Sequence, residues 1–422
     1  MSLAKNTSIT VAARLVVTGT AALSAMIVAG ALGAKGAGTF AEVRVLPSVI
    51  AALLGGGVTI AAPYLIGARK HPVQAITETT VAIGCGLGAV GLVAWALASH
   101  FLHSHVFTEL SGSATIAVGL SIPLQLLLNY LNSIQQGLQS FKGANIVLCS
   151  EEIVTLLLVL PLLAGMGGTT MIWVSDMGGT AVAILVAIGF LLHRGIRPFP
   201  RLHRVIAREA IALGIKGHVG RIANLLNWRL DMMILSFLAN VEVVGYYAVA
   251  SKVAELFRPL SASLTFVLRP LIASLPAHEA RAKGVFLYRR FFAINLGAVV
   301  LMALVGPAII IHLFGPQFAA AVPAFQILLF GLAAHGADGV VNGYNVGIGR
   351  PEFNSYTALA GMVVTVVGDV TLIPTYSLIG AAVTSSAAYT VKAVAMTAIF
   401  LATSGVSLRQ LIGFEEYAPH AV

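Results

Sequence analysis

Five cations interrupt apolar stretches of this sequence: Arg14, Arg221, Arg229, Lys252 and Arg258. A charge in apolar surroundings is costly unless it is paired or lines a polar cavity. Guanidinium and ammonium groups that face one cavity attract anions, and the flat guanidinium binds two phosphate oxygens at once. We therefore expect these five residues to bind an anionic headgroup. For each residue taken alone, an ion pair between helices or an anchor at an interface remains the alternative.

Acidic residues are rarer in the same stretches, and four of them are candidates for ion coupling or for pairing with a cation. Glu255 follows Lys252 by three residues, which places both on one side of a helix. Asp231 is positioned to neutralise Lys252 if their helices are neighbours. Asp338 lies one helical turn after His335, where the two could relay protons. The four candidates are Asp231, Glu255, Asp338 and Asp369.

Other charged residues in apolar stretches receive simpler interpretations. We expect Lys216, Arg269 and Lys392 to anchor helices at an interface, because long basic side chains reach the polar surface from within a helix. The remaining charges have no partner that the sequence identifies: Arg44, Glu42, Glu151, Glu152, Asp176 and Glu209.

Enzymatic and metal chemistry find little support. No Ser-His-Asp arrangement and no pair of catalytic carboxylates is evident, so the chain is not expected to be an enzyme. His100, His103 and His105 lie close together, but no Cys or carboxylate completes a metal-binding set, so we expect neither a metal nor a cofactor. Cys85 and Cys149 fall in apolar stretches, where free cysteine behaves as a small apolar residue.

The composition places these residues in a membrane. Hydrophobic residues make up 58% of the 422 residues and charged residues only 10%, far below the usual share in a soluble domain. In lipid, backbone polar groups must be satisfied within helices of about 20 residues. The sequence therefore predicts an all-α integral membrane protein with about twelve transmembrane helices. They are expected at 9–32, 42–66, 77–100, 113–137, 143–164, 170–193, 209–238, 244–273, 291–313, 319–347, 354–374 and 380–404.

The loop charges predict the orientation. If the N-terminus is cytoplasmic, most loop cations also lie on the cytoplasmic side, in the loops near residues 70, 142, 200 and 285. Lys35 then lies on the outside. This is the pattern of the positive-inside rule. Both termini should then be cytoplasmic. The net charge of +9 thus reflects orientation in a membrane, and no nucleic-acid partner is expected.

The two halves of the chain resemble each other weakly. A shift of 207 residues pairs Arg14 with Arg221, Gly38 with Gly245, and Pro63 with Pro270. Six helices return the chain to its starting side, so a duplication predicts two parallel six-helix bundles related by a pseudo-twofold axis along the membrane normal, a plan found among transporters. The expected divisions are a first bundle at 1–193, a basic cytoplasmic linker at 194–208, a second bundle at 209–404 and a cytoplasmic tail at 405–422.

Several short segments resemble one transporter family. They are 227–231 (NWRLD), 244–252 (VGYYAVASK), 135–139 (QQGLQ), Phe314-Gly315 with Phe318, Gly349-Arg350, and Ile373-Pro374 with 380–382. Their order resembles that of the oligosaccharide flippases of the polysaccharide-export type, within the superfamily of drug/cation antiporters and the lipid II flippase. The resemblance extends over about residues 5–405.

The resemblance implies a polyprenyl-diphosphate-linked oligosaccharide as cargo, moved from the cytoplasmic to the outer leaflet by alternating access in a bacterial inner membrane. Its expected partners are membrane lipids, that cargo and a polysaccharide polymerase. Three alternatives stay open: a multidrug or cation antiporter of the same fold, a lipid II flippase and a membrane-embedded glycosyltransferase. Arg14 in the first helix, without a carboxylate beside it, counts against cationic cargo.

Overall fold

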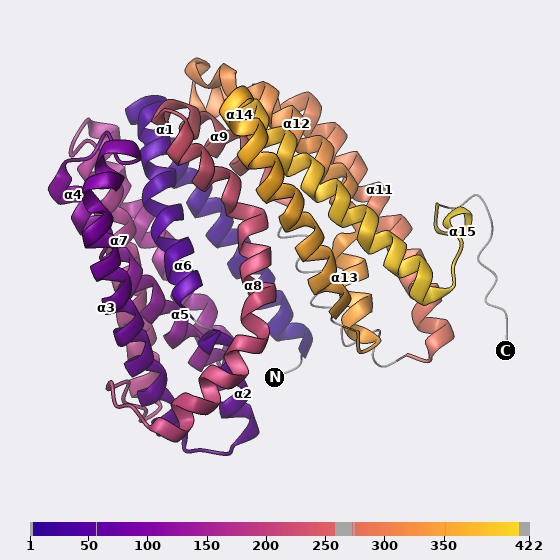
Figure 1. The fold of residues 1–422 in the computed structure, drawn as a ribbon, viewed down its shortest axis with the longest axis horizontal. Helices are drawn as coiled ribbons and strands as arrows, with labels where there is room; N and C mark the ends of the chain where they lie inside the picture. The colour runs from indigo at the N-terminus through magenta and orange to yellow at the C-terminus, as the bar shows by residue number, and fades with distance from the viewer. Residues whose placement is uncertain (1–2, 56, 258–271, 273–274, 351, 413–422) are drawn as a thin grey trace. The chain divides into compact units, whose positions relative to one another are not determined.

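The computed structural model describes residues 3–55, 57–257, 272, 275–350 and 352–412. Every regular element among them is a helix (Figure 1). The first half contains α1 (Leu3–Leu54), α2 (Val58–Ala68), α3 (Val73–His105), α4 (Gly112–Val118), α5 (Ser121–Gly137), α6 (Phe141–Val159) and α7 (Thr170–His193). The second contains α8 (Arg204–Leu238), α9 (Val241–Ala254), α11 (Ala277–Ile309), α12 (Val322–Ala334), α13 (Asp338–Gly347), α14 (Glu352–Ser404) and α15 (Leu408–Ile412).

The predicted all-helical membrane architecture is confirmed. Eight helical stretches in the described part of the chain are long and apolar enough to cross a membrane. Ala12–Leu54 covers most of the predicted 9–32 and the first part of 42–66, and Glu352–Ser404 contains 354–374 and 380–404. The backbone turns sharply inside both, at Gly33 (φ 67°) and at Ser377 (φ 47°). Positive φ costs glycine little, so Gly33 suits the first of these turns.

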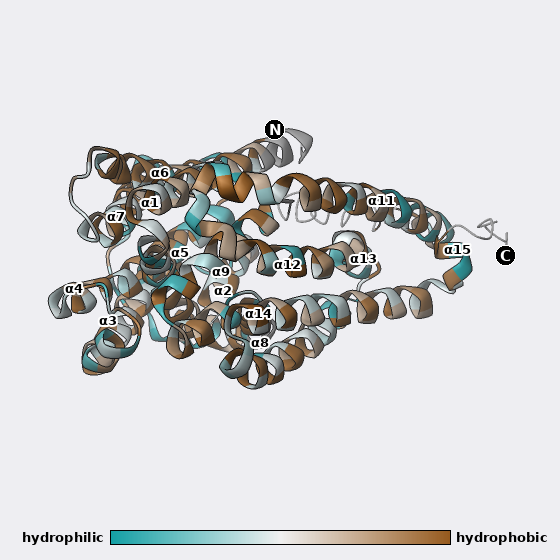
Figure 2. Ribbon diagram, turned by 90° about the horizontal axis from the view of Figure 1, so that it is seen from above, coloured by the Kyte–Doolittle hydropathy of each residue, from teal (hydrophilic) through white to brown (hydrophobic). Residues whose placement is uncertain are grey.

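The helix surfaces fit a lipid environment. Large apolar side chains face outward along them, including Leu97, Leu304 and Phe330, which are 83%, 75% and 74% exposed. Figure 2 shows apolar residues along much of the length of helices such as α6 and α11. In water such surfaces would associate, whereas lipid tails solvate them.

The chain forms two compact units. Unit 1 comprises residues 1–225 and 239–248, and unit 2 comprises residues 226–238 and 249–422. The helices α8 and α9 therefore each contribute to both units. The division of the chain into bundles at the linker 194–208 stays a prediction.

The second predicted transmembrane segment is interrupted inside unit 1. α1 ends at Leu54 and α2 begins at Val58, and Gly57 between them has φ 72°. A Cβ at Gly57 would collide with the backbone of Gly214, so the glycine permits a close approach of two chain segments. The Tyr130 hydroxyl donates to the Gly55 carbonyl at 2.9 Å, so a buried side chain satisfies a carbonyl at the interruption.

Two glycines that the 207-residue shift pairs contact one another in unit 1. A Cβ at Gly245 on α9 would collide with the Ala34 carbonyl and approach the backbone nitrogen of Gly38 on α1. A Cβ at Gly38 would collide with the Val241 carbonyl. Small residues let helix backbones approach this closely in lipid. Contact between equivalent positions is also what a duplicated chain folded about a twofold axis would show.

The basic linker is fastened to the start of α3. The Gln74 side chain donates to the Arg197 carbonyl at 2.7 Å and accepts from the Arg197 backbone N–H at 3.0 Å. His203 contacts the Glu78 carboxylate at 2.8 Å. α8 begins at Arg204, so the unwound part of the linker is shorter than the predicted 194–208.

Candidate functional site

The predicted headgroup cations occupy different parts of the structure. Arg14 on α1 is exposed, whereas Arg229 on α8 and Lys252 on α9 are half-buried. Arg221 lies on α8 with its side chain outside the described atoms, and Arg258 lies outside the described residues. Arg14 belongs to unit 1, and Arg229 and Lys252 belong to unit 2. That the five cations face one cavity therefore stays a prediction.

Two of the candidate acids lie together inside unit 2. Asp231 on α8 is 5% exposed and Asp369 on α14 is fully buried. Asp231 accepts hydrogen bonds from the Ser385 hydroxyl at 2.8 Å and from the Met232 backbone N–H at 2.7 Å. The charge of Asp231 also interacts with the carboxylate of Asp369. We call Asp231 and Asp369 the acid pair.

The surroundings of Asp369 differ from those of Asp231. The buried Asp369 carboxylate interacts with the Thr384 hydroxyl and with the charge of Asp231. Two ionised carboxylates in apolar surroundings require compensation by a proton, a cation or a basic side chain. That the acid pair serves in ion coupling stays a prediction.

The amide of Asn227 holds this part of α8 against α14. Asn227 lies one turn before Asp231 and donates to the Ala358 carbonyl at 2.8 Å. Its own carbonyl oxygen accepts from the Thr365 hydroxyl at 3.1 Å. Asn227 therefore fixes how the two helices that carry the acid pair lie against each other.

Asp338 serves a different purpose, because it is paired. Its Oδ2 lies 3.2 Å from Lys392 Nζ and 3.3 Å from His335 Nε2, and all three groups are largely buried. The rings of Trp228 and Tyr389 pack beside His335 at centroid distances of 5.8 and 5.9 Å. The expectation that Lys392 anchors a helix at an interface is wrong, because its ammonium lies inside unit 2 against Asp338.

Glu255, the fourth candidate acid, opens the 3₁₀ turn Glu255–Phe257 that follows α9. It is half-buried, as is Lys252 three residues before it. A role for Glu255 in ion coupling stays a prediction.

Unit 1 holds a buried ionic cluster that the sequence did not assign. Arg44, from the part of α1 after Gly33, donates from Nη2 to Glu152 on α6 at 2.5 Å and contacts Asp176 on α7 through Nε at 3.2 Å. The exposed fractions of these side chains are 22%, 11% and 4%. Glu151 precedes Glu152 on α6, and its charge interacts with those of the other three residues. We call Arg44, Glu151, Glu152 and Asp176 the Arg44 cluster.

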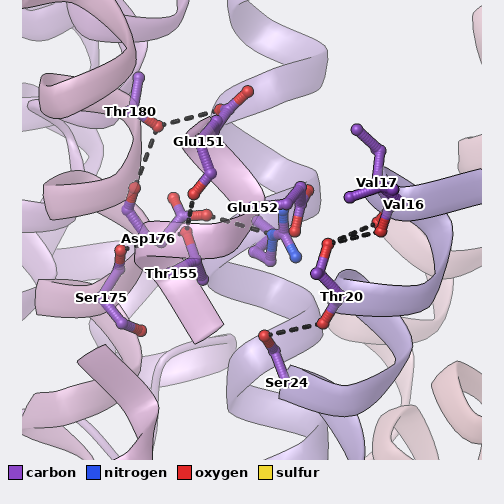
Figure 3. Close-up of polar contacts among 11 residues, drawn as sticks. Val16, Val17, Thr20, Ser24, Glu151, Glu152, Thr155, Ser175, Asp176 and Thr180 are labelled. Carbon is purple, nitrogen blue, oxygen red and sulfur yellow. Dashed lines mark hydrogen bonds and ion pairs between the residues drawn. The ribbon is translucent and has the colours of Figure 1, made fainter. Parts of the chain in front are cut away.

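Hydroxyl groups complete the Arg44 cluster (Figure 3). Thr180 Oγ1 on α7 lies 3.2 Å from Glu151 Oε1 and 3.0 Å from the Asp176 carbonyl oxygen. Glu152 Oε2 and Asp176 Oδ2 are buried without a hydrogen-bond partner. The sequence contained one signal for the cluster, namely opposite charges in apolar segments of the same half.

Comparison with known proteins identifies the family. The model of the family described as polysaccharide biosynthesis protein matches residues 3–275. The chain belongs to this family. This family member is also 28% identical, over 223 residues, to the uncharacterized membrane protein MJ1068 of Methanocaldococcus jannaschii. That alignment covers 50% of this chain and 43% of the relative, so the chain spans less than half of the relative's length.

Solved structures with the same fold are transporters. A multidrug resistance transporter of the MATE family, in an inward-facing conformation, matches with a TM-score of 0.74 and 16% identity over 93% of this chain and 94% of its own. The lipid II flippase MurJ, in an inward closed conformation, matches with a TM-score of 0.73 and 14% identity. This match covers 95% of this chain and 89% of the MurJ chain. A transporter of the MOP superfamily from Pyrococcus furiosus matches with a TM-score of 0.65 and 14% identity, and the match covers 96% of both chains. At these identities the likeness establishes the fold, that of a transporter of about twelve helices in two lobes.

Proposed function

We propose that this protein is a flippase for polyprenyl-diphosphate-linked oligosaccharides, carrying them from the cytoplasmic to the outer leaflet of a bacterial inner membrane. The observation that carries the proposal is membership of the polysaccharide biosynthesis family over residues 3–275. The transporter fold of the structural neighbours supports movement of cargo rather than synthesis. The membrane protein itself is not proposed to be an enzyme.

The charges of the membrane segments favour anionic cargo. The 207-residue shift pairs Arg14 with Arg221, and Arg229, Lys252 and Arg258 add positive charge to the second half of the sequence. A diphosphate would be attracted to such groups, while a cationic drug would be repelled. The transporter from Pyrococcus furiosus is described as having a binding pocket of reverse polarity, which suggests a different function for that protein. By analogy, the sign of the pocket charge would select the cargo here.

The acid pair is the proposed coupling site. Asp369 is buried beside Asp231, so a proton or a monovalent cation would bind there and leave again as the site changes its access. Alternating access between two bundles divided at 194–208, with both termini in the cytoplasm, completes the proposal. The released cargo would be taken up by a polysaccharide polymerase.

The experiment compares lipid-linked sugars in cells depleted of the protein, using mass spectrometry and leaflet accessibility. A polyprenyl-diphosphate oligosaccharide that accumulates in the inner leaflet supports the proposal and names the cargo. Unchanged lipid intermediates contradict it, and uptake of cationic drugs would then be measured.

Variants test the role of the cations. Arg14→Ala combined with Arg221→Ala should abolish export while the protein remains folded in the membrane. Arg194→Ala is the matched control, because this exposed arginine follows α7 outside the membrane segments. Normal export by the double variant would refute the headgroup assignment.

A further inference from the structure

We propose that the Arg44 cluster of unit 1 is a proton-binding site, in which Glu151 carries an exchangeable proton at neutral pH. This site lies in a different unit from the acid pair, and it would exist whatever cargo the protein carries. Four observations support it: the balance of charges, the hydrogen bonds of Thr180, the unpartnered carboxylate oxygens and the position of the guanidinium.

The charges within the cluster do not balance. Arg44 supplies one positive charge, and its guanidinium contacts Glu152 and Asp176. Glu151 does not approach the Arg44 guanidinium as closely as Glu152 and Asp176 do, at 2.5 and 3.2 Å. With all three acids ionised, the buried cluster would carry two uncompensated negative charges, which is strongly unfavourable in apolar surroundings. A proton on Glu151 removes one of them and leaves the two ion pairs intact.

The geometry of Thr180 points to the same acid. A hydroxyl has one proton to donate and lone pairs to accept. Thr180 Oγ1 lies within hydrogen-bond distance of two oxygens, Glu151 Oε1 at 3.2 Å and the Asp176 carbonyl at 3.0 Å. If Glu151 is ionised, one hydroxyl proton has to serve two acceptors. If Glu151 is protonated, it donates to Thr180, and Thr180 donates to the Asp176 carbonyl. Both contacts are then full hydrogen bonds.

Unpartnered oxygens show that the cluster lacks a donor. Glu152 and Asp176 are 8% and 3% exposed, and one carboxylate oxygen of each has no hydrogen-bond partner. Buried acceptors without donors are rare in folded proteins. A proton on Glu151 gives these oxygens no donor, but it lowers the negative charge that surrounds them.

Among the described residues, the charges that act on Glu151 are those of Arg44, Glu152 and Asp176. α1 contributes Arg44, α6 contributes Glu151 and Glu152, and α7 contributes Asp176. α5, which also packs against α6 and α7, has no Asp, Glu, Lys or Arg in Ser121–Gly137. Glu42 precedes Arg44 by two residues and so projects about 200° around the helix from it.

A proton suits the site better than a metal ion. The guanidinium of Arg44 already lies against Glu152 and Asp176, and it would repel a metal cation at the same oxygens. Within the described part of the chain, no group of three or more His, Cys, Asp or Glu side chains is arranged to hold a metal ion.

Infrared spectroscopy of the purified full-length protein in lipid nanodiscs at neutral pH tests the proposal. The background is Asp369→Asn, so that a proton on the acid pair does not contribute. A protonated carboxyl has a carbonyl stretch that an ionised carboxylate lacks, and the band shifts in heavy water if the proton exchanges. We expect this band in the background protein, and we expect Glu151→Gln to lose it. The matched control Glu109→Gln, which changes a partly exposed acid paired with Lys35, should keep it.

A second variant keeps Glu151 in place. Thr180→Val is close in shape and removes the hydroxyl that contacts Glu151. If Glu151 is protonated, the carbonyl band persists at a shifted frequency, because the carboxyl loses its hydrogen-bond partner. A spectrum in which neither Glu151→Gln nor Thr180→Val changes the band would overturn the proposal.

Discussion

Removing the charge of Arg44 should destabilise the protein far more than removing any surface cation. Arg44 contacts Glu152 at 2.5 Å and Asp176 at 3.2 Å, and these acids are 11% and 4% exposed. Breaking a buried ion pair by removing one partner costs about 3–5 kcal/mol, since the other charge is left uncompensated. Arg44→Met should therefore raise the unfolding equilibrium constant by roughly a hundred- to several-thousand-fold, at about 1.4 kcal/mol per tenfold.

The measurement is reversible unfolding in mixed detergent micelles, compared with Lys35→Met. Lys35 pairs with Glu109 at 3.2 Å, but its side chain is 55% exposed, and such pairs contribute about 1 kcal/mol or less. Adding Glu152→Gln and Asp176→Asn to Arg44→Met should recover part of the loss, because both stranded charges disappear. If Arg44→Met unfolds no more readily than Lys35→Met, the cluster is not the buried ionic centre described here.

Three further predictions concern packing, hydrogen bonding and topology. Gly245→Val should lower the free energy of unfolding by about 1–3 kcal/mol or more, because the new side chain meets the backbone of α1. The control Gly30→Ala has open space around the new methyl group and should leave the stability unchanged or raise it. Unfolding of the two variants under the same conditions tests this difference. Asn227→Ala should cost about 1–3 kcal/mol by leaving the Ala358 carbonyl without its amide donor, and an unchanged unfolding midpoint would show that the α8–α14 contact does not depend on it. Reporter fusions after residues 70, 142, 200 and 285 should all report the cytoplasm, and one outside signal would break the proposed orientation.

The helices were predictable because their physical cause is local. Apolar runs of sufficient length require helices in lipid, and most of the segments expected from them are helical among the described residues, including the division of α1 near Gly33. The interruption at Gly57 was not predicted. It depends on the backbone of Gly214, far along the chain, and no local pattern carries that information.

The candidate site was less predictable, because it depends on which helix faces meet. Asp338 and Asp369 have the same side chain in similar apolar segments, yet one lies against Lys392 and the other lies beside Asp231. Arg44 was visible as an intramembrane cation, but its partners come from α6 and α7, more than a hundred residues away. The spacing of residues within one helix does not determine contacts at that separation.

The fastening of the linker to α3 has a consequence for the protein after proteolysis. A protease that cleaves after the exposed Arg201 would divide the polypeptide inside unit 1, not between the units. Gln74 would still hold the new end at Arg197, and Glu78 would still hold His203 on the other fragment. The nicked protein should therefore migrate as two fragments on a denaturing gel and remain one particle in size-exclusion chromatography.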